Sequence, residues 1–163
     1  MTFEITQMTE PDIGDVARCH VACRIEAYSD IVPADDLALR LDVPMVTDSW
    51  AARNADATTP VWIARDDQGD VVGFSHSGPP RTEFPKLPQL ELYLLYVREA
   101  TYGSGLSTEL LLSAIGAKPA WLWTYKVNAR AQRFYGKHGF TRTSAEKLSS
   151  GSAAVTEVQM VRV

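Results

Sequence analysis

Cysteine is scarce in this chain of 163 residues, which contains only Cys19 and Cys23. A single pair rules out the disulfide framework that holds many small secreted domains together. The two cysteines lie four residues apart on an expected helix, where their side chains share a face. Too few other ligands lie nearby for a metal site. We therefore expect two reduced cysteines packed in the fold, and no bound metal.

Long apolar runs and surplus positive charge are missing as well. No run approaches the roughly 20 apolar residues that span a bilayer. Residues 1–6 alternate like a strand and lack the basic and apolar blocks of a signal peptide. A net charge of -4 gives no basic footprint for nucleic acid and weakly favours an amine substrate over a polyanion. We expect a cytoplasmic protein with neither a membrane nor a nucleic acid as partner.

The patterns that are present predict one mixed α/β domain over residues 1–163. Hydrophobic and charged contents of 45% and 22% are ordinary for a globular protein. Apolar residues recur at helical or alternating spacing along the chain. Helices are expected over 13–28, 34–41, 106–115 and 129–138, with a further helix capped by Thr47-Asp48 after a break at Pro44, and strands over 61–64, 71–74, 90–97, 121–126, 140–144 and 155–163, the last two joined by a polar turn at 149–152.

The most informative stretch runs from Leu92 to Leu110. An aromatic-rich apolar run, expected to be a buried strand, meets a turn with Gly103 and Gly105, and apolar residues then return at helical spacing. Such a junction collects unpaired backbone N–H groups at a helix start, where the helix dipole adds positive potential. Two residues without side chains leave room for a bulky anion. The stretch therefore predicts a phosphate-binding loop.

The turn alone does not say which phosphate is bound. A dinucleotide site would have a third glycine where Thr108 stands, and an acidic residue after the next strand. A P-loop would have a lysine after Gly105. Neither nucleotide pattern is complete. Taken by itself, the turn fits a tight strand-to-helix connection as well as it fits an anion site.

Two signatures, in the right order and spacing, make this chain resemble the GNAT acyltransferase superfamily. Residues 95–107 resemble its pyrophosphate-binding motif, Gln/Arg-x-x-Gly-x-Gly/Ala. Residues 121–140 resemble its second signature, which is a strand, an Asn, a short helix with Phe-Tyr, and Gly-Phe. Residues 71–74 are similar to the strand before the motif, and 28–37 to the variable acceptor-binding arm. The resemblance implies a mixed, mostly antiparallel central sheet flanked by helices, with one strand splayed at the cofactor site.

The resemblance also implies acetyl-CoA as the cofactor. Tyr102 replaces a common Arg or Gln of the motif, which would cost a charge-assisted contact to phosphate, while Ser107 replaces a small residue and can add a hydroxyl donor. A basic stripe of Arg130, Arg133 and Lys137 is either a solvated face or a partner of the 3′-phosphate. The implied cofactor-binding residues are Leu95, Tyr96, Val97, Tyr102, Gly103, Ser104, Gly105, Leu106, Ser107, Thr108, Asn128 and Tyr135.

By the same resemblance, Tyr135 is the general acid that protonates the departing thiolate, because a phenol with a pKa of about 10 is protonated at neutral pH. Packing of its helix is the competing interpretation. Glu91 is either the general base or a solvent-exposed cap of its strand. His76 is a second candidate for the base, or a surface or substrate contact. The expected substrate-binding residues are Tyr28, His76 and Glu91, joined by Arg81, Trp50 and Trp62, with core packing as the competing interpretation for the tryptophans.

These residues predict an N-acetyltransferase that moves an acetyl group from acetyl-CoA to a primary amine by direct transfer, without a covalent enzyme intermediate. The acceptor would be a small molecule or a peptide N-terminus, and the resemblance allows a homodimer. One alternative is a non-catalytic acyl-CoA-binding or regulatory module on the same fold, because fold does not guarantee activity. Another is a nucleotide-binding domain. The sequence contains no readable code for the acceptor.

Overall fold

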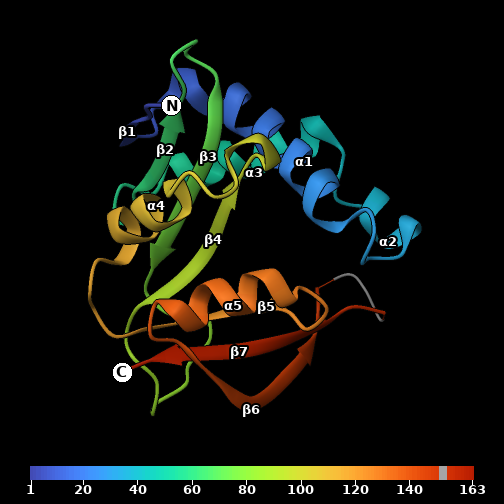
Figure 1. Cartoon of the computed structure of the whole chain (residues 1–163), viewed down its shortest axis with the longest axis vertical. Coiled ribbons are helices and arrows are strands. Elements are labelled where there is room, and N and C mark those ends of the chain that lie inside the picture. The colour runs from blue at the N-terminus through green and yellow to red at the C-terminus, as the bar shows by residue number, and fades with distance from the viewer. Residues whose placement is uncertain (151–153) are drawn as a thin grey trace.

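A central sheet runs through the structure, a computed structural model that describes residues 1–150 and 154–163 (Figure 1). Within those residues the sheet has seven strands: β1 (Glu4–Gln7), β2 (Val61–Arg65), β3 (Val71–Gly78), β4 (Glu91–Val97), β5 (Ala120–Tyr125), β6 (Thr141–Leu148) and β7 (Thr156–Arg162). In space they follow the order β1-β2-β3-β4-β5-β7-β6. Every neighbouring pair is antiparallel except β4 and β5, which are parallel. This confirms the predicted mixed, mostly antiparallel sheet.

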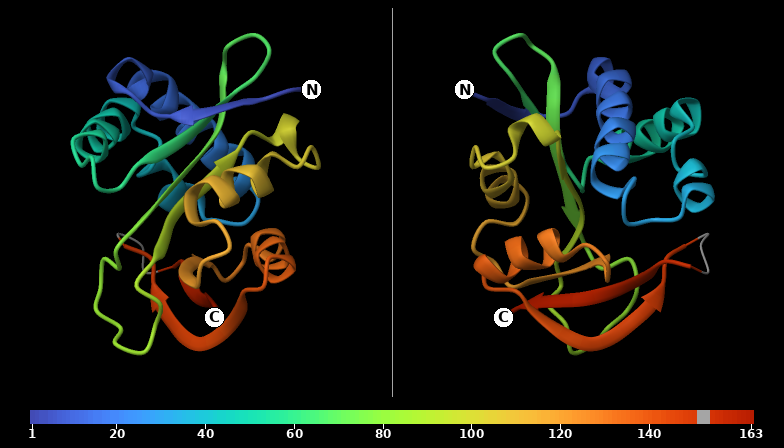
Figure 2. Two further views of the ribbon diagram at one scale, coloured as in Figure 1. Left: turned by 90° about the vertical axis from the view of Figure 1, so that its left-hand side faces the viewer. Right: turned by 45° about the vertical axis from the view of Figure 1, so that its right-hand side comes forward.

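Helices flank both faces of the sheet. They are α1 (Ile13–Tyr28), α2 (Ala34–Ala38), α3 (Val43–Asn54), α4 (Leu106–Ile115) and α5 (Ala129–Lys137), with the short 3-10 helices η1 (Glu10–Asp12) and η2 (Glu99–Thr101). Helices α1 and α3 lie on one face, and α4 and α5 lie on the other (Figure 2). In the part of the chain that the structure describes, no helix has the length and apolar character needed to cross a membrane.

The core between α1, α3 and the sheet contains both cysteines. Cys19 and Cys23 are buried and unpaired, with their Sγ atoms 3.8 Å apart. The prediction of two reduced packing cysteines is therefore confirmed. The other fully buried members of this core include Val16, Trp50, Ile63 and Phe74.

Helix α4 packs closely on β3 because Gly73 has no side chain. A Cβ atom at Gly73 would lie 2.9 Å from Val97 Cγ1 and 3.0 Å from Leu110 Cδ1. The Ser75 hydroxyl also donates to the Leu110 carbonyl over 2.9 Å. These contacts set the height of α4 above the sheet, and so they position the loop that precedes α4 beside β4.

The third helix begins earlier than predicted. The Asp42 carboxylate caps it by accepting a hydrogen bond from the Met45 N–H over 2.8 Å. Pro44 lies in the first turn, where a missing N–H costs nothing. The predicted break at Pro44 and cap at Thr47-Asp48 are therefore wrong. Strands β3 and β6 also extend beyond their predicted ends, and the predicted turn at 149–152 lies partly outside the described residues.

The sheet opens between β4 and β5. Of all the described residues of these two strands, only two pairs face each other, the last of them Leu92 and Leu122. The strands then diverge, so that β4 runs away from β5 and β7 (Figure 1). A register shift against β3 leaves Tyr93 as an extra residue in β4 at this point, and such a bulge bends a strand. The predicted splayed strand is confirmed, and the candidate site lies in the opening.

Candidate active site

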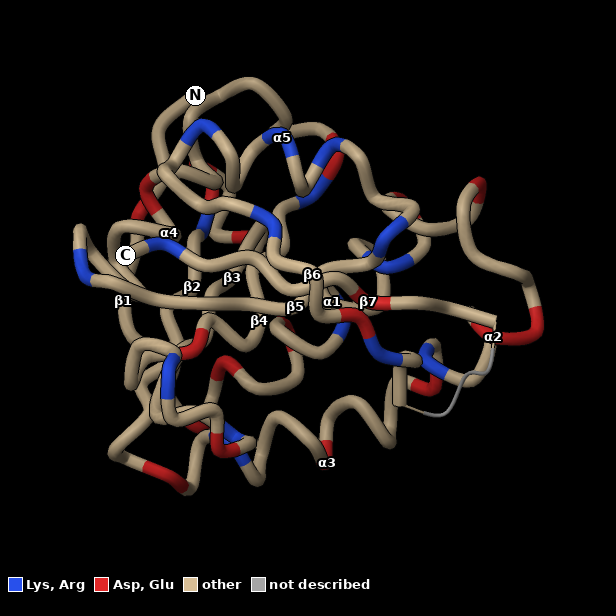
Figure 3. The backbone as a smooth tube through the Cα atoms, turned by 90° about the horizontal axis from the view of Figure 1, so that it is seen from below, with Lys and Arg blue, Asp and Glu red and all other residues tan. Residues whose placement is uncertain are grey.

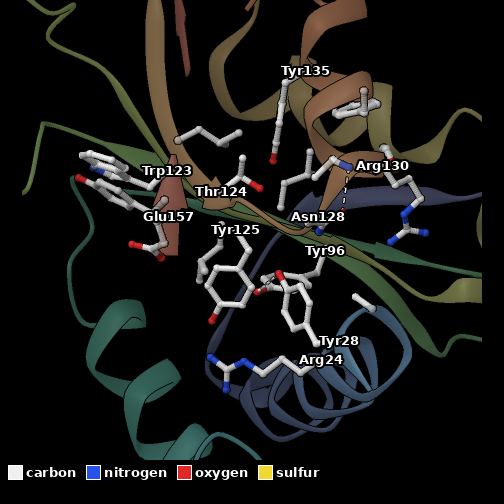
Figure 4. Close-up of a pocket in the computed structure, with 18 of the residues that line it drawn as sticks. Arg24, Tyr28, Tyr96, Trp123, Thr124, Tyr125, Asn128, Arg130, Tyr135 and Glu157 are labelled. Atoms are coloured by element: carbon white, nitrogen blue, oxygen red, sulfur yellow. Dashed lines mark hydrogen bonds between the residues drawn. The ribbon is translucent and has the colours of Figure 1, made fainter. Parts of the chain in front are cut away.

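A cavity of about 830 Å³ lies where β4 and β5 part. Its walls come from β4, β5, α5 and the loop before α4, and on the opposite side from α1 and the segments that follow it. Figure 4 shows Tyr135 on one side of the cavity, with Tyr28 and Arg24 on the other. Segments that are far apart in the chain therefore meet around one hollow.

The main chain of β4 presents backbone groups to this cavity. The Arg98 N–H donates to the Val72 carbonyl of β3 over 2.8 Å. Backbone groups alternate in direction along a strand. The N–H and C=O groups of Tyr96 and Leu94, which precede Arg98 by two and four residues, therefore also face β3. The N–H and C=O groups of Leu95 and Val97 then face the gap that β5 leaves. A ligand with amide groups could pair with them in the manner of an added strand.

The loop before α4 has unused backbone donors. Gly103 and Gly105 have φ angles of +81° and +92°, and a Cβ atom at either would meet no atom within 4 Å. Glycine adopts this left-handed backbone without strain. Over residues 1–150 and 154–163, the N–H groups of Gly103, Gly105 and Ser107 form no hydrogen bond, whereas the Leu106 N–H donates to the Ser104 hydroxyl. Three N–H groups at the positive end of α4 can hold an anion.

Helix α5 brings a guanidinium to the same loop. The Arg130 guanidinium lies over the Tyr102 ring, 3.6 Å from its centroid, in a cation–π contact. It therefore stands beside Tyr102, the position where the resemblance leads us to expect an Arg or Gln. Arg133 and Lys137 follow on α5 and also line the cavity, and basic residues are visible along this helix in Figure 3. None of these three cations forms a salt bridge with a described carboxylate.

Tyr135 packs α5 on the sheet and lines the cavity. The residue is 8% exposed, and its ring lies 5.2 Å from that of Phe134 and 5.7 Å from that of Phe140. Its hydroxyl points into the cavity (Figure 4). Burial, reinforced by the nearby Tyr96, raises the pKa of Tyr135 well above that of a free phenol. The phenol therefore stays protonated through neutral and moderately alkaline pH.

Three further tyrosines form the wall that faces Tyr135. The hydroxyls of Tyr28 and Tyr96 are 3.1 Å apart, and the ring centroids of Tyr28 and Tyr125 are 4.7 Å apart. Burial raises the pKa of Tyr28 and of Tyr96, so both phenols are neutral. Tyr28 lines the cavity as predicted, whereas Tyr125 escaped prediction because it reaches the cavity only through the divergence of the strands.

Glu91 lies in the cavity wall with a partner that the sequence did not reveal. Its side chain is 2% exposed, against 54% for Arg81. Glu91 Oε1 accepts from Arg81 Nε and Nη2 over 3.1 and 2.6 Å, and Oε2 accepts from the Arg81 backbone N–H over 2.8 Å. The alternative interpretation of Glu91 as a solvent-exposed cap is therefore wrong. An ionised carboxylate has about four acceptor positions, so three donors leave about one for water or a ligand.

Two predicted site residues are engaged elsewhere. His76 is buried outside the cavity wall, and its Nε2 donates to the Thr59 carbonyl over 3.1 Å. Burial lowers the pKa of His76 to about 4, so the ring is neutral. The Thr108 hydroxyl lies 3.2 Å from His138 Nε2, and the Thr108 N–H donates to the Gly105 carbonyl. The geometry therefore supports neither a surface role or substrate contact for His76 nor a cofactor contact for Thr108.

The remaining predicted residues divide between the cavity and the core. Asn128 lines the cavity and also caps α5, because its Oδ1 accepts from the Ala131 N–H over 3.0 Å. Arg81 lines the cavity. Trp50 is fully buried in the core, and Trp62 is half-buried outside the cavity wall, so core packing is the better interpretation for both tryptophans.

Sequence reasoning missed several cations that line the cavity, among them Arg24, Arg40 and Arg53. They come from α1, from the segment after α2, and from the end of α3. No local motif sets them apart among the 16 basic residues of the chain. The one available signal was the spacing of Arg24, four residues before Tyr28 and thus on the same helix face.

Comparisons with known proteins identify the family of this chain. The family described as "Acetyltransferase (GNAT) domain" matches residues 57–142, a range that contains β4, the glycine loop and α5. The chain is also 28% identical over 153 residues to the "Uncharacterized N-acetyltransferase YuaI" of Bacillus subtilis (strain 168), which covers 90% of this chain and 85% of that protein.

Solved structures share the fold. A "GCN5-Related N-acetyltransferase: Aminotransferase, Class-II" from Rhodopseudomonas palustris matches with a TM-score of 0.72 and 20% identity, over 99% of this chain and 96% of that chain. The PaiA N-acetyltransferase from Thermoplasma acidophilum, in complex with coenzyme A, matches with a TM-score of 0.68 and 16% identity, over 98% of both chains. Because the family match extends over more than half of its length, this chain belongs to the GNAT acetyltransferase family.

Proposed function

We propose that this protein is an N-acetyltransferase that moves the acetyl group of acetyl-CoA directly to a primary amine. Membership of the acetyltransferase family supports acyl transfer. The relative from Bacillus subtilis bears the name of an N-acetyltransferase, and the PaiA enzyme of similar fold is described in complex with coenzyme A. The observation that carries the proposal is that the unused N–H groups of Gly103 and Ser107 and the main chain of β4 border one cavity with Tyr135.

The described residues suit the parts of the cofactor. The N–H groups of Gly103, Gly105 and Ser107 would hold the diphosphate, and the guanidinium of Arg130 would supply the positive charge that Tyr102 lacks. The backbone of Leu95 and Val97 would pair with the pantetheine amides. This arrangement would place the thioester in the opening between β4 and β5, near Tyr135.

The chemistry divides into tasks for named groups. Acetyl-CoA supplies a thioester whose carbon–sulfur bond breaks as the amine nitrogen bonds to the acetyl carbon. An N–H of Leu95 or Val97 donates to the carbonyl oxygen, where negative charge develops during the attack. Tyr135 donates its proton to the departing sulfur. Because its pKa is raised, the phenol is always protonated at the start of the reaction.

Glu91 receives the proton that the attacking nitrogen loses, through a water molecule at its remaining acceptor position. Solvent then carries a proton back to Tyr135, so each turnover moves one proton from nitrogen to sulfur. A Glu91→Gln variant tests this role. We expect a lower kcat because no carboxylate then accepts the proton, whereas an unchanged kcat would assign the proton to solvent alone.

Thiol release from acetyl-CoA in the presence of a panel of amines tests the proposed function. We expect release with at least one amine, together with a CoA-dependent rise in Tm. A rise in Tm without release by any amine would favour the non-catalytic acyl-CoA-binding module. Stabilisation by ATP or NAD in place of CoA would favour a nucleotide-binding domain.

A further inference from the structure

Three arginines at the end of the cavity away from the glycine loop have no acidic partner among the described residues. Arg24 donates to the Arg40 carbonyl over 2.8 Å, and Arg40 donates to the Ser149 hydroxyl and the Ser150 carbonyl over 3.0 and 2.6 Å. Arg53 lies 5.0 Å from the centroid of a Trp50 ring. Within the described chain, none of the three guanidinium groups forms a salt bridge.

The carboxylates of the cavity wall do not balance these charges. The wall contains Glu91 and Glu157 as its two described carboxylates. Glu91 is bound by Arg81 over 2.6 Å, and Glu157 by Lys147 over 3.3 Å. This end of the cavity therefore carries a surplus of positive charge, although the whole chain has a net charge of -4.

The positive charges of these arginines also repel one another. Burial, followed by the charges of Arg24 and Arg81, lowers the pKa of Arg53. Like charges gathered in a partly buried site destabilise the protein unless an anion accompanies them. A bound anion would offset that cost.

A buried donor lies beside the same arginines. His20 is 2% exposed, and its Nδ1 accepts from Trp50 Nε1 over 3.2 Å, so its proton is on Nε2. No described atom pairs with that Nε2. His20, Arg24 and Arg40 together line a smaller cavity of about 320 Å³. Burial, reinforced by Arg24 and Arg53, holds the pKa of His20 well below its usual range, so the ring offers a neutral N–H donor.

We propose that the acceptor is an amine that also carries a carboxylate, and that Arg24, flanked by Arg40 and Arg53, binds this carboxylate. The inference rests on the proposed N-acetyl transfer and names its substrate class. In Figure 4 Arg24 lies across the cavity from Tyr135, with Tyr28 and Tyr125 between them. The acceptor amine then faces Tyr135 while its carboxylate faces α1.

Matched acceptors test the inference. Glycine, β-alanine, γ-aminobutyrate and leucine are each compared with the corresponding carboxamide in the thiol-release assay. Without a carboxylate site, the amides of glycine and leucine should react faster than the acids, because the amine of an α-amino amide loses its proton more readily than that of the amino acid. We expect the best carboxylate to exceed its amide at least tenfold in kcat/KM, since hydrogen bonds to charged groups contribute about that factor or more.

Substitution of Arg24 assigns the preference to its guanidinium. In Arg24→Gln, which retains a donor for the Arg40 carbonyl, the ratio of carboxylate to amide in kcat/KM should fall to one or below. Arg24→Lys retains a positive charge and should keep part of the preference for the carboxylate. This variant provides the test if Arg24→Gln does not fold. Arg18→Gln is the matched control, because Arg18 lies on α1 outside the cavity and pairs with Asp15. Amides turned over as well as carboxylates, or a preference that survives Arg24→Gln, would overturn the inference and leave N-acetyl transfer intact.

Absence of turnover with every amine would instead contradict the proposed function. The carboxylate site is then tested separately by calorimetric titration of the CoA-loaded protein with N-acetyl-β-alanine and its carboxamide. Tighter binding of the acid that is lost in Arg24→Gln supports the site. Equal binding of the two compounds, or no binding of either, overturns it.

Discussion

The two ends of the cavity are built from different parts of the protein. The end near α4 offers main-chain N–H groups, held in place by Gly103 and Gly105. The end near α1 offers side chains of separate elements, among them Arg24, Tyr28 and Arg53. Main-chain donors persist when most residues are exchanged, whereas a site made of side chains changes with each substitution. The first end therefore suits a constant cofactor, and the second suits a variable acceptor.

We expect the largest effect from a substitution at Tyr135, which lies between the two ends of the cavity. Tyr135→Phe removes one hydroxyl and keeps the packed ring, so we expect kcat to fall about 100-fold or more, as for a positioned proton donor. The KM values for both substrates should change little. Thiol release at saturating substrates measures the effect. Tyr125→Phe, which removes a hydroxyl from the same cavity, should cost far less, and an unchanged kcat in Tyr135→Phe would remove the acid from the mechanism.

Acid should destabilise the whole fold, on which both ends of the cavity depend. The pKa of His76 is lowered to about 4 by burial, below the value of about 6.5 in an unfolded chain. Between these values the unfolded state binds a proton and the folded state does not. The free energy of unfolding should therefore fall as the pH drops from about 6.5 to about 4, by up to about 3 kcal/mol for His76. Buried His20, whose pKa is also lowered, contributes in the same direction.

Urea unfolding between pH 7 and pH 4.5 measures this loss. His76→Gln retains a donor for the Thr59 carbonyl but cannot titrate, so the variant should lose less stability than the parent over this range. An equal loss in parent and variant would show that His76 does not carry the effect.

A substitution at Gly105 tests the end near α4. A side chain in the left-handed backbone at φ +92° costs about 1–2 kcal/mol, and the Cβ would project where the anion binds. We expect Gly105→Ala to raise the KM for acetyl-CoA about tenfold and to leave the preference among acceptors unchanged. Gly14→Ala in α1 is the control, with no change in KM expected. A shift in acceptor preference in Gly105→Ala would contradict the separation of the two ends.

The smallest expected effect belongs to Arg130. Arg130→Gln removes the guanidinium stacked on Tyr102, and we expect the KM for acetyl-CoA to rise about three- to tenfold, because one charge-assisted contact is lost. The increase should shrink at high salt. Arg142→Gln, on exposed β6 away from the cavity, is the control. If both variants show the parent's KM, Arg130 does not contact phosphate.

The sequence predicted the end near α4 because the information there is local. Gly103, Gly105 and the helical spacing after them lie within one short stretch, and Asn128 and Tyr135 lie within one helix turn or two of each other. The start of α3 was mispredicted although its signals are also local, because a proline such as Pro44 fits either a break or a first turn. The splay between β4 and β5 was accessible only through the family resemblance.

The end near α1 depends on tertiary contacts that no local pattern encodes. The pair of Arg81 and Glu91 closes a proline-rich loop and leaves the carboxylate buried and bound, a pairing that decides against the exposed alternative. Arg24, Arg40 and Arg53 converge only once α1, the segment after α2, and α3 have packed. Side chains gathered in this way cannot be read from spacing along the chain.

A crystal structure of the protein with CoA tests the central claim most directly. We expect the diphosphate to accept hydrogen bonds from the N–H groups of Gly103, Gly105 and Ser107, and the sulfur to lie within about 3.5 Å of the Tyr135 hydroxyl. A diphosphate bound elsewhere, or a sulfur remote from Tyr135, would contradict the proposed transfer.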